Sequence, residues 1–180
     1  RKFKPVYLLM GDEPYYIDEI TDMLVSTVLP EEEKDFNQTI RYGMETDVAS
    51  VITMARSFPM MSAYQLIVIK EAQNLSKIEE LEVYAKNPLH TTVLVLNYKN
   101  GTLDKRKKLY AEIDKNGIVF ESKKIPEYKI PAFISSYMQQ KGLAIDAKSA
   151  QMLSDYLGND LSKLTNEIAK LLIAIPKGQT

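Results

Sequence analysis

The chain has 180 residues, a formal net charge of −1, one histidine and no cysteine. Without cysteine it can form neither disulfides nor thiolate metal sites, and a single histidine argues against a His-cluster metal site or a histidine-based triad. The near-zero net charge gives no global attraction to nucleic acid or anionic membranes. No apolar run approaches the ~20 residues that cross a bilayer, and no signal peptide opens the chain, so we expect a cytoplasmic protein without membrane partners. Both ends look cut, so we expect a fragment of a longer protein.

Four short aliphatic segments and a shorter candidate strand around Thr39 and Ile40, separated by segments with helical spacing, predict an α/β fold. The predicted strands are Val6–Met10, Asn37–Tyr42, Leu66–Ile69, Thr92–Leu96 and Ile118–Phe120. The predicted helices between them are Pro14–Leu29, Thr46–Ala55, Ser76–Asn87 and Leu103–Lys115. Alternating strands and helices favour a parallel sheet covered on both faces. Five such units cannot supply the eight strands of a barrel, so we expect an open sheet.

The pattern changes after Ser122, where prolines punctuate a linker and no further strand is indicated. Three amphipathic helices follow, the first centred on Ile134, the second capped by Asp146 and the third capped by Asp160. In the third helix Leu161, Leu164, Ile168, Leu171 and Leu172 form one apolar stripe. We therefore predict an α/β domain over residues 1–122 and a three-helix domain over residues 123–180.

The turn after the first strand is where a parallel sheet most often binds a ligand. Phosphate-binding turns combine several glycines with a lysine, whereas this turn reads Gly11, Asp12, Glu13, Pro14 and has one glycine and no lysine. Pro14 lacks an N–H, and the neighbouring carboxylates repel a triphosphate, so we interpret them as complementing the dipole of the next helix. The third strand ends in Lys70-Glu71, a poor magnesium site. The sequence thus predicts a degenerate nucleotide site with no catalytic residue, metal, cofactor or small-molecule substrate.

The segment before the third strand, Phe58-Pro59-Met60-Met61, is apolar although it lies on a short connection. Pro59 ends the preceding helix. From the pattern alone, the favoured interpretation is that these side chains fill the edge of the core. The alternative is an exposed apolar prong that inserts into a pocket of a partner protein.

Four segments in register carry a family resemblance: Tyr7–Tyr15, the Pro-Met-Met run before Leu66–Ile69, Leu103–Tyr110 and Gly158–Ile168. Together they resemble the delta subunit of the bacterial DNA polymerase III clamp loader. The resemblance implies a first domain of the AAA+/P-loop NTPase type that has lost ATP binding, a small helical lid domain, and a collar domain that nothing here matches. It also implies a non-catalytic subunit of the polymerase holoenzyme in the nucleoid-associated bacterial replisome.

The same resemblance implies that two adjacent apolar residues before the third strand enter a pocket of the beta sliding clamp and help to open its ring for loading onto primed DNA. Here those positions are Met60 and Met61, with Phe58 and Pro59 supporting them. Methionine replaces the usual aromatic residue and adapts well to irregular apolar pockets. The other implied partners are the delta-prime and gamma/tau loader subunits. With the resemblance, the prong becomes the favoured interpretation.

Two alternatives stay open. A nucleoside-triphosphate hydrolase on the same sheet needs the phosphate donors that the Gly11–Ile17 turn lacks. A DNA-backbone-binding module would use the basic run Lys105, Arg106, Lys107 and Lys108, with Lys115, although such a run is more often a solvated helix face.

Overall fold

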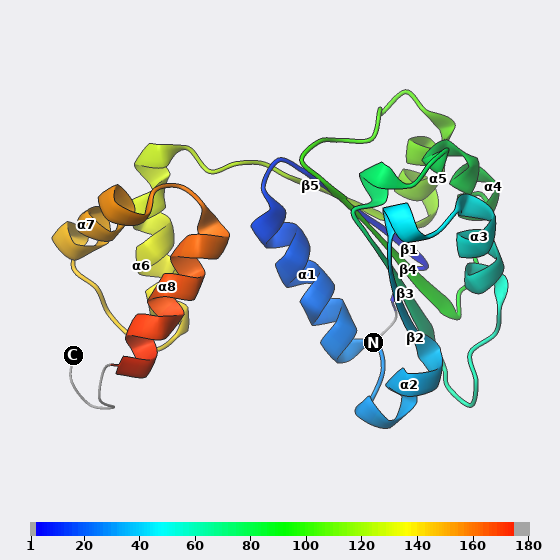
Figure 1. Ribbon diagram of the computed structural model, residues 1–180, viewed down its shortest axis with the longest axis horizontal. Helices are drawn as coiled ribbons and strands as arrows, with labels where there is room; N and C mark the ends of the chain where they lie inside the picture. Colours follow the sequence, from blue (N-terminus) through cyan, green and yellow to red (C-terminus); the bar gives the residue numbers. More distant parts are fainter. Residues whose placement is uncertain (1–2, 175–180) are drawn as a thin grey trace. The chain divides into compact units, whose positions relative to one another are not determined.

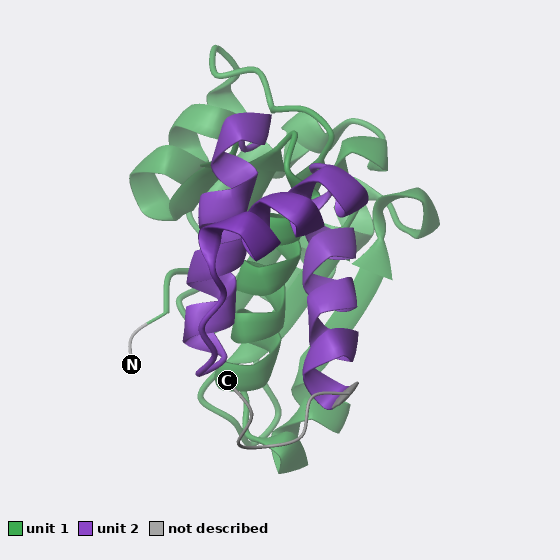
Figure 2. Cartoon of the chain, turned by 90° about the vertical axis from the view of Figure 1, so that its left-hand side faces the viewer, with its two compact units in different colours: residues 1–123 green, residues 124–180 purple. Residues whose placement is uncertain are grey.

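A computed structural model describes residues 3–174 and divides the chain into two compact units, residues 1–123 and 124–180 (Figure 2). The second range includes residues 175–180 of the predicted helical domain, which lie outside the described residues. The two units are built from separate sets of helices and strands.

The first unit contains a five-stranded parallel sheet, as predicted (Figure 1). The strands lie in the order β2-β3-β4-β1-β5, which places β4 in the centre, β3 and β1 on either side of it, and β2 and β5 at the edges. Their bounds are Val6–Gly11 for β1, Gln38–Tyr42 for β2, Gln65–Lys70 for β3, Thr92–Lys99 for β4 and Ile118–Ser122 for β5. The sheet is open, because β2 and β5 each pair with one neighbour only.

Helices cover both faces of the sheet (Figure 1). The side chains of β1 alternate: Tyr7 and Leu9 pack in the cluster that includes Leu24 of α1, whereas Leu8 and Met10 pack on the opposite side. On the first face lies α1, Pro14–Thr27. On the other lie α3, Val48–Arg56, α4, Glu82–Ala85, and α5, Lys108–Asn116. Burial on both faces explains why β1, β3 and β4 are largely continuous apolar runs in the sequence.

Two helices of the first unit begin at residues that favour the start of a helix. Pro14 occupies the first turn of α1. Asp47 caps α3, because its carboxylate accepts a hydrogen bond from the Ser50 N–H at 2.9 Å. The polar segment 31–35, between the first predicted helix and the second predicted strand, is partly helical, with a 3₁₀ turn at Glu31–Glu33 followed by α2, Lys34–Asn37. The second strand consequently begins at Gln38, one residue later than predicted.

Two predicted helices are shorter than expected. The helix predicted from a Ser76 cap is a 3₁₀ turn at Ile78–Leu81 followed by α4, and Lys77 precedes it with a left-handed φ of 56°. The helix predicted from Leu103 begins only at Lys108. There the Asp104 side chain accepts from the Arg106 N–H at 2.9 Å, and the Asp104 carbonyl accepts from the Lys107 N–H at 3.0 Å. This local turn competes with the helix, so Leu103 and Arg106 do not lie on a helical stripe.

Short 3₁₀ turns complete the first unit at Gly43–Glu45 and Ala72–Asn74, and one opens the second unit at Glu127–Lys129. The second unit then contains α6, Ile130–Gln140, α7, Ala147–Leu157, and α8, Leu161–Ala174. Asp146 caps α7 by accepting from the Ser149 N–H, and Asp160 accepts from the Lys163 N–H at the start of α8. The predicted stripe of α8 is buried through Ile168, but Leu171 is 46% exposed, so the stripe does not continue to the end of the helix.

The two edges of the parallel sheet carry different features. The turn between β1 and α1 lies at the carboxyl ends of the strands, where ligands usually bind. The loop of residues 57–64 precedes β3, and α2 precedes β2, so both lie at the amino ends. The predicted nucleotide turn and the predicted prong are therefore on opposite edges of the sheet.

Candidate functional site

The turn after β1 is filled by its own neighbours. Gly11 has φ 132°, and a Cβ at this position would lie 1.9 Å from the Ser122 carbonyl oxygen of β5. The Asp12 N–H donates to the same oxygen at 3.0 Å, and the Gly11 carbonyl accepts from the Asn100 N–H at 2.9 Å. A phosphate-binding loop uses its backbone N–H groups to bind the ligand, whereas the Asp12 N–H already donates to Ser122 within the fold.

A carboxylate of the chain occupies the N-terminus of α1. Glu13 is buried and accepts from the Tyr15 N–H at 3.1 Å, and its carbonyl accepts from the Ser122 hydroxyl. Burial, with the nearby charge of Glu13, raises the pKa of the Tyr16 phenol. The acids near the start of α1 are predicted to complement the helix dipole. One of them, Asp18, instead forms an ion pair with Lys99 of β4 at 2.6 Å. A bound triphosphate would have to displace Glu13, which supports a degenerate nucleotide site.

The end of β3 offers no cation site. Glu71 has a left-handed φ of 50°, and its carboxylate accepts from the Asn74 side-chain amide at 3.1 Å. Within residues 3–174, no three His, Cys, Asp or Glu side chains come close enough together to hold a metal ion.

The apolar segment before β3 projects from the molecule. Met60 is 57% exposed, Met61 is 98% exposed and Phe58 is 78% exposed, whereas Pro59 is half-buried. These side chains therefore do not fill the edge of the core, the interpretation that the pattern alone favoured. The exposure of Phe58 also means that its ring does not pack beneath the two methionines. We call Phe58, Met60 and Met61 the apolar tip.

The loop that carries the apolar tip is fixed at its base. The Gln65 side chain at the start of β3 donates to the carbonyls of Ser57 and Met54, and it also hydrogen-bonds the Thr92 hydroxyl. That hydroxyl donates to the Ala55 carbonyl at 2.8 Å, which ties the end of α3 to β4. At the far end, the Ser62 hydroxyl donates to the Tyr64 carbonyl. The tip is thus an exposed apolar surface on an ordered base, the arrangement typical of a protein-binding site.

Sequence reasoning missed two residues of this loop system, Gln65 and Asn37. Asn37 was predicted as the first residue of a strand, but it ends α2 and its side chain hydrogen-bonds the backbone of Met60. An isolated Asn or Gln at the end of an element is a common turn residue, so no pattern marks these two.

The basic run predicted to contact DNA is largely neutralised within the fold. Lys105 pairs with Glu121 at 2.6 Å, and Lys107 lies 3.8 Å from Glu79. The Arg106 guanidinium binds both carboxylate oxygens of Asp104, which lowers the pKa of that carboxyl to about 2. Contact of Lys105, Arg106, Lys107 and Lys108 with the DNA backbone stays a prediction, weakened by these pairs.

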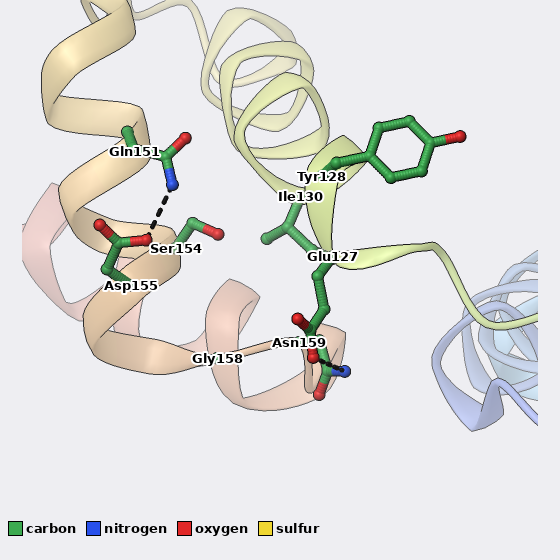
Figure 3. A pocket seen from close by; sticks show the side chains of 8 residues that line it. All are labelled: Glu127, Tyr128, Ile130, Gln151, Ser154, Asp155, Gly158 and Asn159. Carbon is green, nitrogen blue, oxygen red and sulfur yellow. Dashed lines mark hydrogen bonds between the residues drawn. The ribbon is translucent and has the colours of Figure 1, made fainter.

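The second unit contains a polar cavity of 380 Å³ between the start of α6 and the end of α7 (Figure 3). Its polar groups bond one another: Gln151 donates to Asp155 at 2.8 Å, and the Asn159 amide lies 3.5 Å from Glu127. Tyr128 projects from the cavity in Figure 3, and within the described residues no hydrogen bond joins the Ser154 hydroxyl to a carboxylate of the cavity. The cavity therefore offers no catalytic arrangement.

A model of the family "DNA polymerase III, delta subunit" matches residues 7–123, which is more than half of the chain. The chain belongs to the DNA polymerase III delta subunit family. A curated relative, DNA polymerase III subunit delta of Bacillus subtilis (strain 168), is 30% identical over 177 residues, covering 93% of this chain and 51% of the relative. The chain thus spans about half the length of that relative.

Solved structures agree with this family membership. The DNA clamp loader delta protein of Bacillus subtilis superposes with a TM-score of 0.77 at 27% identity, covering 97% of this chain and 55% of that one. A DNA polymerase III gamma subunit-related protein of Thermotoga maritima superposes with a TM-score of 0.56 at 12% identity, covering 97% and 58% of the two chains, and shows the fold alone. The resemblance in the sequence and the predicted α/β fold of the AAA+ type are thereby confirmed for this family member.

Proposed function

We propose that this chain is the clamp-binding part of a clamp-loader delta subunit, and that its apolar tip inserts into an apolar pocket of the beta sliding clamp. The observation that carries the proposal is the exposure of Met60 and Met61 on a loop with an ordered base. A large exposed apolar pair on an anchored loop is costly to leave in water and gains free energy when a partner covers it.

The size of this gain fits a specific interface. Full burial of one methionine side chain contributes about 1.5–3 kcal/mol, so two contribute about 3–6 kcal/mol. Since 1.4 kcal/mol is tenfold in affinity, the pair accounts for roughly two to four decades. A few side chains usually dominate an interface in this way.

The remaining steps of the proposal follow from the family. Clamp binding holds one interface of the ring open for loading onto primed DNA, together with the delta-prime and gamma/tau subunits, in the nucleoid-associated replisome of the cytoplasm. This subunit does not hydrolyse ATP, because Glu13 and Ser122 fill the turn where phosphates would bind. The first unit is the degenerate AAA+-like domain and the second the helical lid, with a collar domain in the rest of the protein.

Binding to the immobilised cognate clamp tests the proposal. The variant Met60→Ala/Met61→Ala is expected to weaken binding by at least about a hundredfold, because it removes the two methionine side chains whose burial accounts for roughly two to four decades of affinity. Met44→Ala/Met152→Ala is the matched control, since it truncates two other exposed methionines, 79% and 62% exposed, that are not part of the tip. A folded Met60→Ala/Met61→Ala variant that binds like wild type would show that the tip does not contact the clamp.

A further inference from the structure

One side chain outside the loop holds the backbone of the apolar tip. Asn37, the last residue of α2, is 5% exposed. Its Oδ1 accepts from the Met60 N–H at 2.6 Å, and its Nδ2 donates to the Met60 carbonyl at 3.0 Å. A single planar amide thus satisfies both backbone groups of Met60, as a paired residue of a neighbouring strand would.

The Asn37 amide is itself fixed in orientation. Its Nδ2 also donates to the Glu33 carbonyl at 3.2 Å, one turn earlier in the chain. A primary amide has two donor hydrogens, so both are in use, along with an acceptor position on the oxygen. Met60 is therefore held at a defined place relative to α2 and to the beginning of β2.

This fixation matters most for the next residue, Met61. Its φ of 51° lies in the left-handed region that residues other than glycine rarely adopt. The Met61 side chain is almost fully exposed, so it makes little packing that could maintain this conformation. Hydrogen bonds constrain the residues on both sides of Met61: those of Asn37 at Met60, and those between the Ser62 hydroxyl and the Tyr64 backbone. Residues held in rare backbone conformations cluster at binding sites, where the surrounding structure determines them.

We propose that Asn37 is a positioning residue for the apolar tip, which holds Met60 and Met61 in their partner-binding conformation before the partner arrives. The proposal rests on the proposed function of the tip. Because Asn37 is buried, it acts through Met60 and does not contact the partner itself. A loop that is ordered in advance avoids the entropy loss of ordering on binding. A loop that samples other conformations binds more weakly, because its apparent affinity is the intrinsic affinity multiplied by the fraction of time it spends in the binding-competent conformation.

Two variants separate this role from a general effect on folding. Asn37→Ala removes both hydrogen bonds to Met60. Asn37→Asp keeps the acceptor for the Met60 N–H but turns a carboxylate oxygen toward the Met60 and Glu33 carbonyls, which repels them until the carboxylate is protonated. Each is made in the whole protein, and methionine-methyl NMR reports the mobility of Met60 and Met61. Buried Met10 of β1 serves as the internal reference for the fold.

We expect Asn37→Ala to raise the methyl mobility of Met60 and Met61 and to leave that of Met10 unchanged. Clamp binding should weaken about tenfold if the loop is in its binding-competent conformation about one tenth of the time. In Asn37→Asp, acidification should restore the order of both methyl groups. Unchanged tip mobility and clamp affinity in a folded Asn37→Ala variant would overturn the proposal. If that variant loses the Met10 signal, Asn37→Asp decides alone, and wild-type tip mobility at every pH overturns the proposal.

The two proposals fail in different ways. If Met60→Ala/Met61→Ala binds the clamp like wild type, the proposed function is wrong, whatever the mobility measurements give. If that variant loses binding but the Asn37 variants keep both affinity and tip order, the function stands and the positioning role is wrong.

Discussion

Gly11 and Ser122 lie so close that a single added methyl group cannot fit between them, since a Gly11 Cβ would be 1.9 Å from the Ser122 carbonyl oxygen. The backbone of Gly11 also has a φ of 132°, which an L side chain rarely adopts. The end of β1 and the end of β5 are therefore joined at the place where an active member of this fold class would hold phosphates.

The first prediction is that Gly11→Ala destabilises the first unit by at least about 2 kcal/mol, because it combines a backbone clash with strain. Chemical denaturation measures this loss. Gly101→Ala is the matched control: its Cβ would meet only a Tyr98 ring atom at an ordinary 3.7 Å. Equal stability of the two variants would contradict the close approach.

The second prediction concerns the left-handed Met61. Met61→Gly is expected to stabilise the folded chain by up to about 1 kcal/mol, because glycine relieves the backbone strain and no buried side chain is lost. The same change should weaken clamp binding, since it deletes half of the methionine pair. Met60→Gly is the control, because Met60 has no positive φ and glycine there should destabilise. The measurements are denaturant unfolding and clamp affinity; a loss of stability in Met61→Gly would contradict the argument.

The third prediction concerns DNA. Asp104→Asn/Glu121→Gln frees Arg106 and Lys105 from their carboxylates, so it should increase the affinity for duplex DNA at low salt. The log–log slope of affinity against salt should steepen by up to about 0.9 for each freed cation that contacts a phosphate. Two comparable changes elsewhere, Asp22→Asn/Asp155→Asn, control for the altered net charge. An increase in DNA affinity no larger than in this control would show that the basic run is not part of a DNA-binding surface.

The fourth prediction is a titration. The hydrogen bond from the Arg106 side chain stabilises the ionised Asp104 carboxylate and lowers its pKa from 3.8 to about 2. A lowered pKa in the folded state means that this contribution to stability is complete above pH 4 and is lost as the pH falls through 2. Carboxyl-carbon NMR should show the Asp104 midpoint near pH 2 in wild type and at a higher pH in Arg106→Gln, which removes the guanidinium but keeps the backbone N–H bond to Asp104. Midpoints that coincide would show that the pair does not persist in solution.

Most of the α/β fold could be predicted because burial on both faces leaves a direct mark on the sequence. Leu66–Ile69 and Thr92–Leu96 are continuous aliphatic runs, and the structure places them in adjacent strands in the middle of the sheet. The helix predicted from Leu103 failed for a local reason. Asp104 forms a turn with its own neighbours, and periodicity does not detect a side chain that competes with helical hydrogen bonds.

The apolar tip could be located in the sequence, but its exposure could not be decided there. Phe58, Met60 and Met61 would have the same pattern if they folded back onto the core. Side chain-to-backbone contacts from Asn37 and Gln65 hold the loop in this conformation. Gln65 contacts Ser57 from only eight residues away, whereas the Asn37–Met60 contact joins residues that are 23 apart in the sequence. The Asn37 contact depends on the sheet order that places β2 beside β3, and no short window of sequence predicts it.

The exposure of the two thioethers has a chemical consequence. Peroxide reaches the sulfur of Met61 without any opening of the fold, whereas Met10 is shielded within the sheet. Oxidation to the sulfoxide adds a polar, chiral oxygen to a side chain that works by being apolar, and reductases can reverse it. Under the proposed function, a methionine tip makes clamp binding sensitive to oxidants in a way that a phenylalanine tip does not.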